Sequence, residues 1–132
     1  MSGIRRPDYR LKQKLLYIDQ TNPNALRNYG DLFMQDGLLS DALDFYQKAG
    51  DSESLEKIRM SAIENGDAML FGQAAKALGM ELKPADWEKV GQKAVDLKKY
   101  SFARHAFQKA NNEALLASLT TIMQKEIDGK VA

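Results

Sequence analysis

The side chains that could do acid–base or metal chemistry in this chain are few, and they do not form a recognisable site. His105 is the single histidine, and it lies between Arg104 and Ala106 in a stretch with helical spacing. The chain has no cysteine that could join it in a metal site, and no serine stands in the context that a catalytic triad needs. We therefore expect His105 to be a packing or surface residue, with no metal bound.

Other catalytic patterns are also missing from the sequence. The nine glycines are scattered and form no phosphate-binding loop. Glu53 and Glu56 are spaced as on the exposed face of a helix, and no carboxylate stands in an apolar context that would raise its pKa. The sequence therefore predicts a protein that is not an enzyme and that uses no cofactor.

The N-terminal segment offers binding chemistry of another kind. Residues 1–20 contain five basic and two acidic groups, and Tyr9 and Tyr17 lie among them, whereas residues 21–56 contain two basic and seven acidic groups. Basic groups interleaved with aromatics can bind nucleic acid or an anionic membrane. Asp8 and Asp19 interrupt the segment, however, and no nucleic-acid-binding motif is present. We keep this as the alternative function, and we expect neither nucleic acid nor membrane to be the main partner.

The overall composition indicates an ordinary globular protein. The chain has 132 residues, of which 44% are hydrophobic and 28% charged, and its formal net charge is +1. This length suits one domain, so we expect a single domain over residues 1–132. No apolar run approaches the roughly twenty residues of a membrane-spanning helix. The polar N-terminus does not resemble a secretory signal, and we expect a cytoplasmic protein.

The elements that would position these side chains all read as helices. Asp8 can cap a first helix, Pro23 suits the first residue of the next, and Ser40 is expected to cap the second helix of that hairpin. No segment alternates like a strand. The spacing predicts an all-α fold of about eight helices, arranged as stacked antiparallel helical hairpins. We expect a capping helix over about 8–20, hairpins over about 23–50, 52–79 and 84–110, and a C-terminal capping helix over about 112–127.

Two parts of the chain match when one is shifted by sixty-one residues. The matched positions follow one pattern: large, large, small and apolar, then small, aromatic and small. Gly30 and Gly91 would each cost up to about 1 kcal/mol inside a helix, so we expect a close helix contact at both. The first set is Leu26, Tyr29, Gly30, Phe33, Ala42, Tyr46 and Ala49, and the second is Trp87, Val90, Gly91, Ala94, Ala103, Phe107 and Ala110.

This pattern resembles the tetratricopeptide repeat family over residues 23–56 and 84–117, although the helix-terminating proline of that family is absent. Residues 42–51 and 102–112 also look like the related helical solenoids of vesicle-coat subunits. Both resemblances imply an alpha–alpha superhelix that acts as an adaptor or scaffold for other proteins. They also imply that the aromatic Trp87 belongs to the core, and that end hairpins of two chains could stack in self-association.

The resemblance further implies a concave groove that binds a peptide or an amphipathic helix. Glu88 and Gln92 stand where family members with a carboxylate clamp would have a lysine and an asparagine, so we do not expect such a clamp. Acidic groups beside Met34 and Met60 favour a basic or amphipathic helical ligand. The predicted groove residues are Asn24, Arg27, Asp31, Met34, Gln35, Glu56, Met60, Glu88, Gln92 and Asp96.

Overall fold

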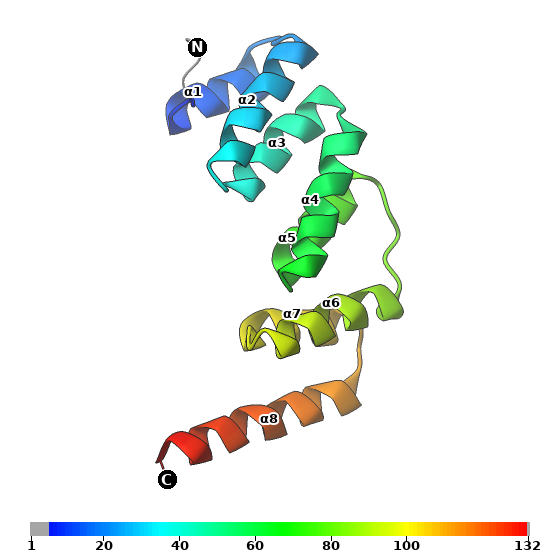
Figure 1. Cartoon of the computed structure of the whole chain (residues 1–132). Coiled ribbons are helices and arrows are strands. Elements are labelled where there is room, and N and C mark those ends of the chain that lie inside the picture. Colours follow the sequence, from blue (N-terminus) through cyan, green and yellow to red (C-terminus); the bar gives the residue numbers. More distant parts are fainter. Residues whose placement is uncertain (1–5, 132) are drawn as a thin grey trace. The chain divides into compact units, whose positions relative to one another are not determined.

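A computed structural model of the chain describes residues 6–131, and over this range the fold is all-α, as predicted (Figure 1). A short π-helical segment, η1, follows the first α-helix. The last helix extends beyond the predicted end. The elements are α1 (Tyr9–Gln13), η1 (Lys14–Ile18), α2 (Pro23–Gln35), α3 (Leu39–Ala49), α4 (Ser52–Glu64), α5 (Ala68–Ala77), α6 (Pro84–Asp96), α7 (Tyr100–Lys109) and α8 (Glu113–Val131).

Most helix starts follow the predicted capping chemistry. The Asp8 side chain accepts a hydrogen bond from the Leu11 N–H at 2.9 Å, which caps α1. Pro23 is the first residue of α2, where its missing N–H costs no hydrogen bond. The prediction for Ser40 was wrong: α3 begins at Leu39, and the residue before it offers no side-chain cap. Ser40 therefore lies inside the first turn of the helix.

The chain divides into two compact units, of which unit 1 covers residues 1–58. Its centre is the hairpin of α2 and α3, and η1 packs against α3. Two buried rings belong to its core, in which Phe33 stacks on Phe45 at 5.5 Å between ring centroids. Tyr29 adds a tilted contact to Phe45 at 5.7 Å. Aromatic packing of this kind holds the two helices of the hairpin together.

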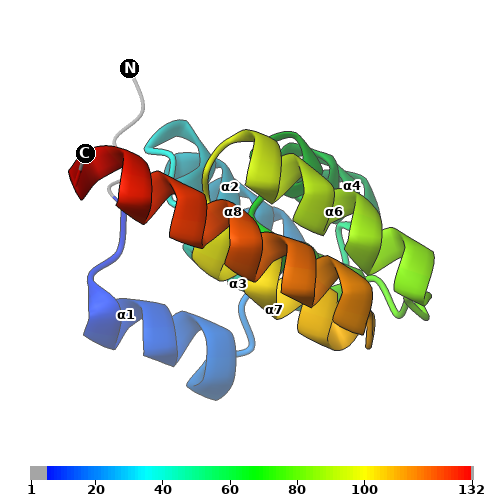
Figure 2. The ribbon, with the colours of Figure 1, turned by 90° about the horizontal axis from the view of Figure 1, so that it is seen from below.

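Unit 2 covers residues 59–132. The hairpin of α6 and α7 forms its centre, α5 packs on both of these helices, and α8 packs on α7. Figure 2 shows α8 beside α7 when the ribbon is seen from below. One core cluster of this unit consists of Ala94, Ala103, Phe107 and Leu119.

Gly30 of α2 and Gly91 of α6 each make room for an aromatic ring of the facing helix. A Cβ at Gly30 would lie 2.7 Å from Cε1 of Tyr46, and one at Gly91 would lie 2.6 Å from Cε1 of Phe107. These rings are 2% and 1% exposed, so neither can move aside freely. The close contact predicted at each glycine is therefore with a ring rather than with a neighbouring backbone.

No helix within residues 6–131 combines the length and the apolar character that crossing a bilayer requires. The single domain over 1–132 and the stacking of all hairpins into one superhelix stay predictions.

Candidate partner-binding groove

The predicted groove residues are divided between the two units, and each set is described by itself. Unit 2 contains Met60, Glu88, Gln92 and Asp96. Unit 1 contains the other six, which are Asn24, Arg27, Asp31, Met34, Gln35 and Glu56.

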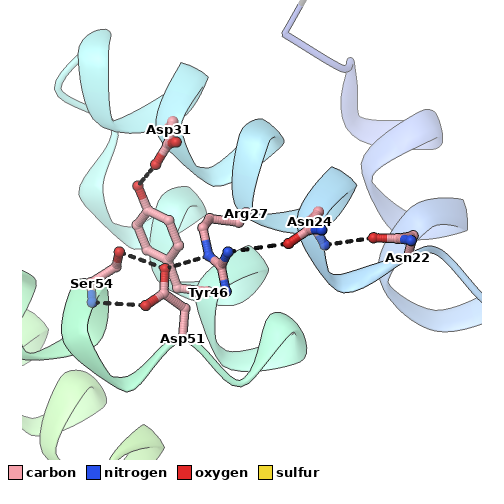
Figure 3. Close-up of polar contacts among 7 residues, drawn as sticks. All are labelled: Asn22, Asn24, Arg27, Asp31, Tyr46, Asp51 and Ser54. Carbon is pink, nitrogen blue, oxygen red and sulfur yellow. Dashed lines mark hydrogen bonds and ion pairs between the residues drawn. The ribbon is translucent and has the colours of Figure 1, made fainter.

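In unit 1, Arg27 is committed to contacts within the protein (Figure 3). Its Nε donates to the carboxylate of Asp51 at 3.0 Å, and its Nη1 donates to the side-chain oxygen of Asn24 at 3.2 Å. Asp51 also accepts from the backbone N–H of Ser54 at 3.2 Å and from its hydroxyl at 2.7 Å. Arg27 thus joins α2 to the residue that caps α4.

The ionisation of Asp51 reflects this position. Partial burial opposes the charged carboxylate, but the hydrogen bonds from Ser54 and the charge of Arg27 outweigh it and lower the pKa of Asp51. The carboxylate therefore stays charged at neutral pH and holds both partners.

Asp31 is also engaged within the hairpin. Its carboxylate accepts a hydrogen bond from the buried Tyr46 hydroxyl at 2.6 Å, as Figure 3 shows. Burial, followed by the hydrogen bond and charge of Asp31, raises the pKa of Tyr46. Of the predicted residues on α2, only the half-buried Met34 and the exposed Gln35 make no side-chain hydrogen bond within the described chain.

In unit 2, Glu88 has an intramolecular partner too. Its carboxylate accepts from the side-chain amide of Asn112 at 3.0 Å. Asn112 in turn caps α8, because its side-chain oxygen accepts from the Leu115 N–H at 3.0 Å. Glu88 therefore faces the start of α8.

The neighbouring positions on α6 line an open hollow of about 560 Å³, which we call the α6 hollow. Two of its residues, Gln92 and Asp96, were predicted for the groove. The lysines beside these two residues were not predicted from the sequence. The resemblance placed Glu88 in the groove and passed over its neighbour Lys89. The helical spacing from 89 through 92 and 93 to 96 could have identified this face. The lining residues are Ile63, Glu64, Lys89, Gln92, Lys93 and Asp96.

The α6 hollow combines apolar surface with charged groups. Most of its lining surface is apolar. Two lysines and two carboxylates surround it, and none of these four groups makes an ion pair within the described residues: Lys89, Lys93, Glu64 and Asp96. The α6 hollow therefore carries both positive and negative groups.

Trp87 and His105 pack against each other at another place on unit 2. The indole meets the rings of Phe71 and His105 edge-on, with centroid distances of 5.4 and 5.8 Å. Burial, and then the charge of Lys109, lower the pKa of His105. Both side chains are only partly buried, and they line an open hollow of about 240 Å³, so Trp87 packs against its neighbours but is not the core residue that the resemblance implied. Within residues 6–131 no group of three acidic or histidine side chains is placed to hold a metal ion.

Much of the basic N-terminal segment is neutralised inside unit 1. Arg6 pairs with Asp36 at 2.8 Å. Lys12 pairs with Asp41 and Asp44 at 2.6 and 2.9 Å, and although burial opposes its charge, these two carboxylates raise the pKa of Lys12. Arg10 and Lys14 make no ion pair within the described chain, and Arg5 lies outside it.

Comparison with protein-family models, with curated proteins and with solved structures finds no match to this chain.

Proposed function

We propose that this protein is a non-catalytic interaction module that binds another protein at the α6 hollow. The observation that supports the proposal is an apolar depression surrounded by four charged side chains that make no ion pair within the described chain. Its volume of about 560 Å³ suits one or two apolar side chains of a ligand. Charged groups at its edges would select and orient that ligand.

The ligand that fits this chemistry is an amphipathic peptide or helix. An apolar side chain of the ligand would fill the space over Ile63. Carboxylates of the ligand would meet Lys89 and Lys93, and its basic groups would meet Glu64 and Asp96. This is the helix-in-groove mode of recognition, in which apolar anchors supply affinity and edge charges supply register.

The resemblance to tetratricopeptide repeats supports the same proposal, because the groove of that family is lined by the first helix of each hairpin. Here α4 and α6, which line the hollow, are the first helices of their predicted hairpins. An adaptor role in the cytoplasm belongs to this proposal.

A photo-crosslinking amino acid at Gln92 tests the proposal in the native host. The matched control places the same amino acid at Gln108, which is exposed on α7 and does not line the hollow. We expect a protein to be crosslinked from position 92 and not from position 108. Crosslinking of the same proteins from both positions, or of none from either, would contradict the proposal.

The captured protein then allows a quantitative test. We expect Lys89→Glu/Lys93→Glu to weaken its binding by about tenfold or more, because two edge contacts become repulsive. The control is Lys57→Glu/Lys125→Glu, which reverses the same amount of charge at exposed lysines outside the hollow. Equal loss in both variants would show that only net charge matters.

A further inference from the structure

The turn between α4 and α5 contains the only asparagine of the chain that is followed by a glycine, at Asn65–Gly66. The backbone nitrogen of the glycine can attack the side-chain carbonyl carbon of the asparagine, because glycine has no Cβ to obstruct the approach. The other five asparagines precede proline or residues with a side chain. Asn65 is also exposed to water. It is therefore the asparagine at which spontaneous modification is chemically easiest.

The modification in question is deamidation. The Gly66 nitrogen forms a bond to Cγ of Asn65, which closes a five-membered succinimide ring, and the side-chain nitrogen leaves as ammonia. Water then opens the ring at either of its two carbonyl groups. One opening gives aspartate, and the other gives isoaspartate, in which the main chain runs through the former side chain. The net reaction converts an amide and water into a carboxylic acid and ammonia, and it makes asparagine a thermolabile residue.

The packing of the turn requires the glycine that makes this reaction easy. A Cβ at Gly66 would lie 2.7 Å from Cα and 2.8 Å from N of Ala94 on α6. Backbone atoms of a packed helix cannot move aside as the end of a side chain can. The φ of +62° at Gly66 also disfavours any residue with a side chain. The chain therefore keeps a reactive dipeptide where this turn meets α6.

The folded turn holds the two reacting groups apart. The Gly66 N–H donates to the carbonyl of Ile63 at 3.1 Å. The side-chain amide of Asn65 donates to the carbonyl of Ser61 at 2.9 Å and to its hydroxyl at 3.3 Å, so it lies back along α4. Nζ of Lys99 donates to the carbonyl of Asn65 at 2.7 Å and fixes the peptide between the two residues. Ring closure therefore requires the turn to open.

We propose that Asn65–Gly66 is a deamidation site that the folded turn protects and that reacts through local opening. Local openings cost less free energy than global unfolding, and surface turns are among the places where they occur. When opening and closing are fast, the reaction rate follows the fraction of chains in which the turn is open. The folded chain should therefore deamidate at Asn65 about tenfold or more slowly than the unfolded chain.

The products of the reaction do not fit the turn. Isoaspartate inserts a methylene group into the main chain beside the glycine that packs against Ala94, and either product adds a negative charge next to Glu64. Ile63 and Glu64 line the α6 hollow, so deamidation changes one edge of that hollow. An effect on partner binding would rest on the proposed function, whereas the reaction itself does not.

The test compares the folded full-length chain with the same chain in guanidinium chloride, both incubated in mildly alkaline buffer. Peptide mapping by mass spectrometry follows deamidation at each of the asparagines, and chromatography separates the aspartate and isoaspartate products. We expect Asn65 to react first in the unfolded chain and to be protected in the folded one. Asn65→Gln should abolish the signal from this peptide, because the longer side chain would have to close a larger ring.

Lys99→Met tests whether opening of the turn controls the rate. It removes the hydrogen bond to the Asn65 carbonyl, and it should speed up deamidation of the folded chain about threefold or more without changing the rate in guanidinium chloride. The matched control is Lys109→Met, which removes the same charge from the exposed face of α7 and should leave both rates unchanged. Thermal unfolding followed by circular dichroism checks that both variants are folded during the incubation.

Equal rates in the folded and unfolded chains would overturn protection by the turn, and faster reaction at another asparagine of the unfolded chain would overturn the assignment to Asn65. An unchanged or slower reaction in folded Lys99→Met would overturn control by opening. Chains deamidated at Asn65 can be separated by their added negative charge, and they should unfold at a lower denaturant concentration than the parent chain. None of these measurements uses a partner, so this inference and the proposed function can fail separately.

Discussion

The α2–α3 and α6–α7 hairpins use the same scaffold with different polar chemistry. In each, a glycine of the first helix faces a buried ring of the second, as Gly30 faces Tyr46 and Gly91 faces Phe107. Both glycine–ring pairs obey the sixty-one-residue shift. The shape of the contact is thus repeated, although the two rings are not the same.

The shift also relates the polar links that follow each hairpin. Arg27 binds Asp51, which caps α4, and the equivalent Glu88 binds Asn112, which caps α8. In the first link Arg27 donates the hydrogen bond, whereas in the second link the equivalent Glu88 accepts it. The comparison teaches that the position of the link is set by the fold and that its donor and acceptor can be exchanged.

Two further pairs of equivalent residues differ between the hairpins in ways that affect stability. Tyr46 has a hydroxyl that bonds to Asp31, whereas Phe107 has none. At the turn inside each hairpin, Gly37 adopts φ +74°, and the equivalent residue of the second hairpin is Lys98 at φ 59°. Glycine accepts this backbone easily, and lysine does not.

Replacing the packed glycines should have the largest effect. In an ordinary helix Gly→Ala stabilises, but here Gly91→Ala and Gly30→Ala should each cost about 1–3 kcal/mol because the new Cβ meets a buried ring. Urea unfolding of each variant measures this cost. Adding Phe107→Leu to Gly91→Ala should recover part of it through coupling between the two sites. A gain in stability from either glycine substitution would show that the ring contact is misplaced.

Loss of the helix caps should come next. Asp51→Ala removes the cap of α4 and the partner of Arg27, and it should cost about 1–2 kcal/mol. Asn112→Ala removes a cap and a neutral amide partner, and should cost about 1 kcal/mol. Chemical denaturation compares the two variants. If Asn112→Ala proved the costlier, the charged link would not be the stronger one.

Tyr46→Phe makes the first hairpin resemble the second and should cost about 0.5–1.5 kcal/mol at neutral pH. The raised pKa of Tyr46 adds a pH dependence. Its stabilisation is complete below pH 10, the pKa of an ordinary tyrosine, and is lost as the pH rises from there towards the folded-state pKa. Stability of the wild type should thus fall more steeply above pH 10 than that of Tyr46→Phe. Parallel pH profiles would contradict the raised pKa of Tyr46.

Lys98→Gly should have the smallest effect and the opposite sign. It removes a lysine from left-handed backbone, and should stabilise the protein by up to about 1 kcal/mol. The ion pair that Lys98 makes with Glu126 at 3.6 Å is exposed, so losing it should matter little. Gly37→Lys is the reverse change in the first hairpin and should destabilise. Thermal unfolding measures the change in stability of both variants. If both substitutions stabilised the protein, or both destabilised it, the turn geometries would be wrong.

Local chemistry explains what the sequence could predict of the fold. Asp8 and Asp67 cap helix starts by accepting hydrogen bonds from N–H groups three residues further on, and Pro23 occupies a first helical position that needs no N–H, so these roles are readable from a few residues. Ser40 has the right residue type for a cap, yet α3 begins one residue earlier. The apolar spacing of residues 14–18 predicted an ordinary helix, whereas this segment forms a π-helical turn in which Leu15 and Leu16 are buried.

The candidate site was less predictable than the fold, because its residues depend on which side of α6 lines the hollow. Family positions placed Glu88 in the groove, but its bond to Asn112 directs it to α8. Gln92 and Asp96 do line the hollow, whereas Lys89 and Lys93 were missed. Likewise, Arg27 and Asp31 have partners many residues away, at Asp51 and Tyr46, which a linear reading does not reveal.

The packing of Trp87 against Phe71 and His105 has an optical consequence. It is the only tryptophan of the chain, and it lies in unit 2, whereas unit 1 contains tyrosines and phenylalanines but no tryptophan. Emission excited at the red edge of indole absorption therefore reports on one unit, while far-ultraviolet dichroism records both. Any difference between the two denaturation curves would be a direct reading of how independently the halves melt, obtained without a label.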